Sequence, residues 1–162
     1  MEGKIFLAKR DISIELFKLK EDGNAFIEAK FLDSGHLLRL EMEIEPESKK
    51  IVKCQAEMPN APFQICSQTT KKAKSLIGLV IEKGVMKKIA EAVGGPCGCI
   101  HLRELASDAA NFAAGVLIGY GKEGGGLLTA EFEKQPEEVR LRVTKEALQN
   151  NCLAYKEDKV VC

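Results

Sequence analysis

An alternation of apolar and polar residues through the first third of the chain constrains the fold more than any other feature of the sequence. Turn-forming residues such as Asp22 and Gly23 separate four segments that show it, residues 12–19, 25–32, 38–44 and 51–57. A period of two places successive side chains on opposite faces of a β-strand, and short turns join neighbouring strands antiparallel. These segments therefore predict a four-stranded antiparallel meander with one face open to water.

The middle and the end of the chain change to the spacing of helices. Residues 67–80 and 84–93 predict two helices, and Pro136 suits the first position of a last helix. Apolar residues three and four apart predict the buried stripe of another helix, Leu102, Leu105, Ala109, Phe112, Ala113 and Val116. Strands followed by helices indicate an α+β fold, with three or four helices on one face of the meander.

The length of 162 residues suits a single domain over residues 1–162. We expect the meander in residues 1–58 and a helical part in residues 66–118. A run of three glycines predicts a flexible linker over residues 119–135, and the C-terminal helix and tail follow in residues 136–162.

The charge balance and the lengths of the apolar runs limit the classes of partner that we expect for this protein. Lys and Arg number 24 and Asp and Glu also number 24, so the net charge of zero argues against a nucleic-acid partner. No apolar run approaches the ~18 residues of a membrane span, and the apolar stretch at the start is short for a signal peptide. We therefore expect a cytoplasmic protein without a membrane partner. An unknown protein partner, or a second copy paired at the exposed edge of the meander, is consistent with the sequence.

Thiol and imidazole groups meet at the start of a predicted helix. Six cysteines in a cytoplasmic chain are expected to be reduced, and so to act as ligands, reactive thiols or small packed residues. Cys99 and His101 lie two residues apart, and thiolate and neutral imidazole are strong ligands for zinc or iron. The plainer interpretation is that Cys99 packs and that His101 caps the helix. By contrast, His36 lies in a turn and is expected to be solvated.

Two further cysteines can join that pair in a metal site. Cys66 stands at the exit from the meander, at the start of the first predicted helix, and Cys152 follows the last helix. If these helix ends meet at one end of the sheet, Cys66, Cys99, His101 and Cys152 form a set of ligands. Three thiolates and one imidazole suit tetrahedral zinc, or an iron–sulfur cluster with a histidine in place of one cysteine.

Several motifs resemble a known family. Cys66, Gly94-Gly95 and Asn151-Cys152 belong to the pattern, and its most specific stretch is Gly98-Cys99-x-His101-Leu102-x-Glu104-Leu105. The chain in this respect resembles a bacterial domain-of-unknown-function family, number 2889. That resemblance implies a grouping and no function.

A more distant resemblance concerns the order of the elements and cysteines. The sequence is similar to the NifU/IscU iron–sulfur scaffold proteins and the related SufE sulfur acceptors. The resemblance implies a NifU/SufE-like fold in which Cys66 and Cys99, with His101 nearby, match scaffold ligands. The early cysteine of those scaffolds has no counterpart here, because nothing before Cys54 is a cysteine.

Three functions from different classes follow. The first is a metal- or iron–sulfur-binding protein. The second is a thiol-dependent enzyme or sulfur carrier, with Cys99 as the nucleophile and His101 as its base or thiolate partner. The third is a small binding module in which the cysteines only pack. Whether the protein is an enzyme therefore stays open at this point.

Overall fold

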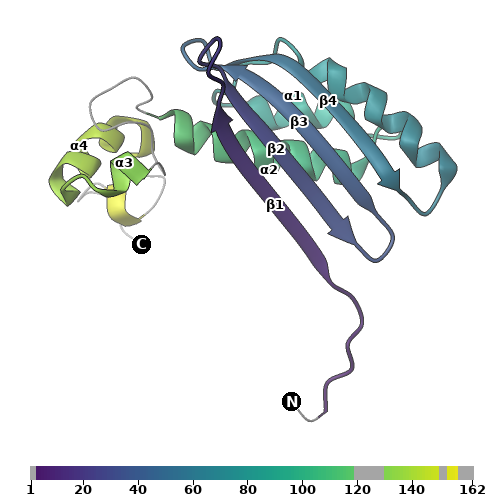
Figure 1. Ribbon diagram of the computed structural model, residues 1–162. Helices are drawn as coiled ribbons and strands as arrows, with labels where there is room; N and C mark the ends of the chain where they lie inside the picture. Colours follow the sequence, from purple (N-terminus) through teal and green to yellow (C-terminus); the bar gives the residue numbers. More distant parts are fainter. Residues whose placement is uncertain (1–2, 119–129, 150–152, 157–162) are drawn as a thin grey trace. The chain divides into compact units, whose positions relative to one another are not determined.

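The computed structural model describes residues 3–118, 130–149 and 153–156 (Figure 1). The chain divides into two compact units, Met1–Ala113 and Ala114–Cys162, and each is described by itself.

The first unit is built on a four-stranded antiparallel sheet. Its strands are β1 (Arg10–Lys18), β2 (Ala25–Asp33), β3 (Leu37–Glu45) and β4 (Lys50–Asn60), in the order β1-β2-β3-β4 (Figure 1). Each strand pairs with the next along the chain, so the predicted meander is confirmed. The register sets Arg10 at the start of β1 opposite Asp33 at the end of β2.

One face of the sheet is apolar and carries the helices. The helices α1 (Val85–Val93) and α2 (Ile100–Leu117) lie behind the sheet in Figure 1, and the helical segment η1 (Gln64–Leu76) lies beside β4. Alternate residues of the central strands are buried, among them Ile27, Phe31, Leu38, Leu40, Met42 and Ile44. The intervening side chains, such as Glu28 and Lys30, are exposed on the other face. The α+β class is thus confirmed.

The helix predicted over residues 67–80 differs from the structure in type and extent. Residues Gln64–Leu76 form a 3₁₀ helix in which hydroxyl groups bind carbonyls three residues back; Thr69 Oγ1, for example, donates to the Cys66 carbonyl at 2.6 Å. Gly78 then donates to the Ile51 carbonyl at 2.8 Å, and Ile51 donates to the Leu79 carbonyl at 2.9 Å. Pairing with the start of β4 therefore ends the helix early, an interaction that periodicity along the chain does not reveal.

The second unit contains short helices. They are α3 (Ala130–Glu133), α4 (Glu137–Leu148) and η2 (Leu153–Tyr155). Pro136 immediately precedes α4, and Glu137 and Glu138 occupy its first turn, where carboxylates complement the helix dipole. Residues 119–129 of the predicted linker lie outside the described residues, and its last part includes α3. None of the helices in the described ranges has the length and apolar character required to cross a bilayer.

Candidate functional site

The turn between β2 and β3 is organised by the carboxylate of Asp33. Its Oδ1 accepts hydrogen bonds from the backbone N–H groups of Gly35 and His36, both at 2.9 Å. The Asp33 N–H in turn donates to the His36 carbonyl at 3.0 Å. An aspartate that binds the backbone two and three residues later is a recurrent way to close a turn. Its effect here is to fix the position of His36.

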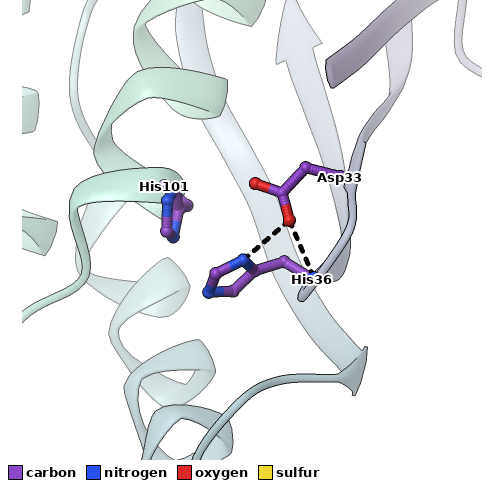
Figure 2. Close-up of side chains that lie close together, drawn as sticks. All are labelled: Asp33, His36 and His101. Carbon is purple, nitrogen blue, oxygen red and sulfur yellow. Dashed lines mark hydrogen bonds and ion pairs between the residues drawn. The ribbon is translucent and has the colours of Figure 1, made fainter. Parts of the chain in front are cut away.

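The imidazole of His36 turns back toward the same carboxylate. Its Nδ1 lies 2.9 Å from Asp33 Oδ1, and only 17% of its side chain is exposed (Figure 2). The expectation that His36 is solvated is therefore wrong. Its ring is shielded by Phe31, whose centroid lies 6.2 Å away, and by His101, whose centroid lies 4.1 Å away.

His101 reaches this turn from the first turn of α2. Its ring centroid lies 4.9 Å from that of Phe31, a fully buried residue of β2. Ligand atoms of Asp33, His36 and His101 all lie within 4.8 Å of one another (Figure 2). Two imidazoles and a carboxylate, from a turn and a helix start some seventy residues apart in sequence, thus form one group.

The local electrostatics favour the metal-binding forms of Asp33 and His101. The Gly35 N–H, followed by the His36 ring, lowers the pKa of Asp33 to about 2, so the carboxylate is charged at neutral pH. Burial, followed by the neighbouring His36, lowers the pKa of His101 below its ordinary value, so its imidazole is neutral there. An ionised carboxylate and a neutral imidazole are the states that metal ligation requires.

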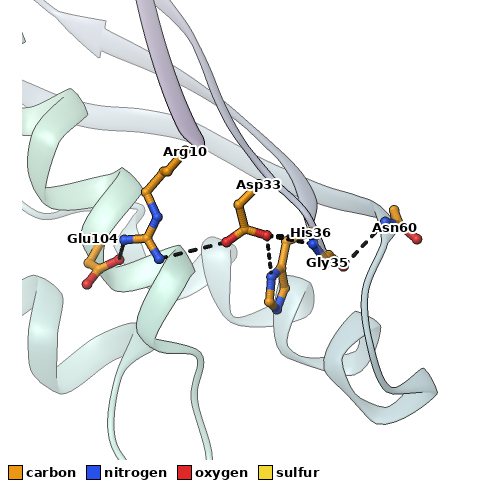
Figure 3. Close-up of polar contacts among 6 residues, drawn as sticks. All are labelled: Arg10, Asp33, Gly35, His36, Asn60 and Glu104. Atoms are coloured by element: carbon orange, nitrogen blue, oxygen red, sulfur yellow. Dashed lines mark hydrogen bonds and ion pairs between the residues drawn. The ribbon is translucent and has the colours of Figure 1, made fainter. Parts of the chain in front are cut away.

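The guanidinium group of Arg10 lies next to the cluster of Asp33, His36 and His101. Arg10 Nη2 lies 3.7 Å from Asp33 Oδ2, and Arg10 Nη1 lies 3.5 Å from Oε2 of Glu104 on α2 (Figure 3). The guanidinium carbon also lies 4.7 Å from the centroid of the Phe31 ring, which is cation–π geometry. Asn60, the last residue of β4, donates to the Gly35 carbonyl at 3.3 Å and ties the turn to the neighbouring strand.

The cysteines occupy different surroundings. Cys66 in η1 and Cys99 immediately before α2 are half-buried, and Cys97 is exposed. Cys54 is buried in β4, where desolvation raises its pKa to about 12. Cys152 lies outside the described residues.

The ligand set predicted from the sequence and the group observed in the structure share one residue, His101. In the described ranges, Asp33, His36 and His101 are the residues that bring three ligand-type atoms together, and neither Cys66 nor Cys99 is among them. Ligation by these cysteines stays a prediction. Asp33 and His36 were missed, although the spacing Asp33-x-x-His36 around a turn was the available signal.

The comparisons with known proteins give a family and no activity. A family model described as "Protein of unknown function (DUF2889)" matches residues 8–114, a range that includes Asp33, His36 and His101. No curated protein and no solved structure matches the chain. The resemblance to that family is confirmed, whereas the resemblance to NifU, IscU and SufE proteins stays a prediction.

Proposed function

The chain belongs to the DUF2889 family, and we propose that it is a metal-binding protein in which Asp33, His36 and His101 hold one divalent transition-metal ion. The observation that carries the proposal is the convergence of their ligand atoms within 4.8 Å. Ligand atoms bound to one ion at about 2.1 Å lie no more than about 4.2 Å apart. A small inward rotation of the side chains would therefore suffice for binding.

The donor set suits particular ions. Two imidazoles and one carboxylate bind non-haem Fe(II) with open positions, and they also bind zinc with a fourth position left for water or another ligand. Calcium and magnesium prefer all-oxygen sites, so they fit this set poorly. We propose zinc or ferrous iron as the ion.

The two carboxylate oxygens of Asp33 suit different tasks. Oδ1 accepts from Gly35 and His36, including the His36 ring at 2.9 Å. A ring that keeps the hydrogen bond from Nδ1 points Nε2 away from Asp33, so His36 binds the same ion as Asp33 through Nδ1, and the ion replaces that hydrogen bond. Oδ2 accepts none of these hydrogen bonds, and in Figure 2 it points to the side of His101. It is the oxygen we assign to the ion.

The cysteines predicted from the sequence form the competing ligand set. Cys99 lies two residues before His101, so thiolate ligation with Cys66 and Cys152 would also use that histidine. Removal of a thiol and removal of an imidazole therefore distinguish the two sets.

The test is calorimetric titration of Co²⁺ and Zn²⁺ into metal-free protein. We expect one ion per chain for the unchanged protein, and we expect His36→Ala and His101→Ala to abolish the binding. Cys66→Ser and Cys99→Ser are the matched controls and are expected to bind as the unchanged protein does. Absence of binding to the unchanged protein, or its loss in Cys99→Ser with retention in His36→Ala, would refute the proposed site. Circular dichroism of each variant reports whether it is folded.

A further inference from the structure

We infer that the metal ion binds a small carboxylate monoanion, and that Arg10 receives the second oxygen of that anion. The inference rests on the proposed metal site. It adds the chemical class of the ligand and assigns a task to Arg10, which is not one of the three metal ligands. It is carried by the position of the guanidinium beside Asp33 Oδ2 and by its unused hydrogen-bonding capacity.

The guanidinium of Arg10 is held in place, but it makes no short hydrogen bond to either neighbouring carboxylate. Its distances of 3.7 Å to Asp33 and 3.5 Å to Glu104 exceed the roughly 2.7–2.9 Å of charge-assisted hydrogen bonds. About half of the side chain is exposed (48%), so an anion in solution can reach it. The Phe31 ring, 4.7 Å from the guanidinium carbon, limits its movement on the inner side. Arg10 therefore presents free donors in a defined place.

The ion and the guanidinium lie close enough to share one ligand. An ion bound to Asp33 Oδ2 at about 2.1 Å lies at most about 6 Å from Arg10 Nη2, given the 3.7 Å between that nitrogen and Oδ2. A carboxylate with one oxygen on the ion and the other at about 2.8 Å from a guanidinium nitrogen spans this separation. The positions that three protein ligands leave open on zinc or iron supply the place for the first oxygen.

The charge of the site favours a monoanion. A divalent ion and Arg10 bring three positive charges, and the ionised Asp33 and Glu104 bring two negative charges, while His36 and His101 are neutral as metal ligands. One positive charge remains, and one carboxylate neutralises it. A carboxylate is a monoanion at neutral pH, whereas phosphate groups carry between about one and two negative charges there.

Glu104 provides a second, independent test of the role of Arg10. Its carboxylate lies 3.5 Å from Arg10 Nη1 and competes with an incoming anion for the same guanidinium. Removal of its charge, as in Glu104→Gln, should therefore strengthen anion binding, whereas Arg10→Gln should weaken it. A merely structural Arg10–Glu104 pair would give changes of the same sign in both variants.

The experiment uses full-length protein loaded with Co²⁺, titrated with acetate and followed by the visible spectrum of the ion. We expect a spectral change that saturates, an affinity about tenfold or more lower in Arg10→Gln, and a higher affinity in Glu104→Gln. The matched control is Arg39→Gln, because Arg39 also pairs with a glutamate but on the other face of the sheet, and its acetate affinity is expected to be unchanged. Each variant is first checked for its Co²⁺ content.

The outcomes distinguish the proposed metal site from the inferred binding of a carboxylate. Failure of the unchanged protein to take up Co²⁺ overturns the proposed function and this inference with it. Uptake of Co²⁺ with no response to acetate, or with equal acetate affinity in Arg10→Gln, overturns this inference alone. Tighter binding of inorganic phosphate than of acetate overturns the assignment to carboxylates.

Discussion

Asp33 shows how one side chain can organise both a turn and a site. Its Oδ1 closes the turn after β2 and orients the His36 ring, while its Oδ2 faces Arg10. Hydrogen bonding to the ionised form lowers the pKa of this carboxylate from 3.8 to about 2. Two of the three ligands of the proposed ion, Asp33 and His36, therefore also form the turn.

The candidate site was only partly predictable at the level of residues. His101 could be found because it stands beside Cys99 at a helix start. From the sequence, His36 is expected to be a solvated turn residue. The local sequence contains no signal that α2 places His101 against it. That contact depends on the packing of both rings against Phe31, which is tertiary information.

The two histidines are expected to influence each other's protonation in the metal-free protein. Burial and the nearby His36 both lower the pKa of His101, so His36→Ala should raise that pKa toward its ordinary value. The chain contains two histidines, so the variant has a single imidazole signal to follow by NMR during a pH titration. An unchanged or lower His101 pKa in the variant would contradict the arrangement of the two rings.

At the level of elements, period-two and helical spacing were sufficient to predict most of the architecture. The four strands and the helices that begin near residues 85 and 100 follow from patterns within each segment. The predicted C-terminal end of the helix over residues 67–80 was wrong, because Gly78 and Leu79 form backbone hydrogen bonds with Ile51 of β4. Periodicity describes which face a segment buries and carries no information about a distant strand that competes for its backbone.

The connection between α1 and α2 sets the position of His101. A Cβ atom on Gly98 would lie 2.2 Å from the carbonyl oxygens of Val93 and Gly94, so only glycine fits there. Gly98→Ala should therefore displace the start of α2, lower the free energy of unfolding by about 1–3 kcal/mol and weaken metal binding. Urea unfolding and calorimetry measure the two effects.

Gly35→Ala is the control for this change. The nearest atom to a Cβ at Gly35 is Asp33 Oδ1 at 3.9 Å, an ordinary contact, so the substitution should leave both quantities nearly unchanged. Equal effects of the two substitutions would mean that the tight approach at Gly98 does not position the helix.

At the level of the whole molecule, Asp33 links stability to pH. Its pKa is lowered from 3.8 to about 2 in the folded protein, so its contribution is complete above the unfolded value and is lost as the pH falls toward 2. We expect Asp33→Asn to be less stable than the unchanged protein at pH 6, by about 1–2 kcal/mol from the loss of charge-assisted hydrogen bonds.

The difference in stability between the two proteins should shrink as the pH is lowered from about 4 to about 2, within the range set by the two pKa values. Urea unfolding at a series of pH values measures it. A difference that stays constant over this range would show that the charge of Asp33 does not stabilise the fold.

The measurement that tests the metal site most directly is X-ray absorption spectroscopy of the zinc-loaded protein. Ligation by Asp33, His36 and His101 predicts a shell of nitrogen and oxygen atoms at about 2.0–2.2 Å, with the multiple scattering of imidazole and no sulfur. The shell should disappear in His36→Ala. A sulfur shell at about 2.3 Å in the unchanged protein would contradict the account and would instead indicate the cysteines as ligands.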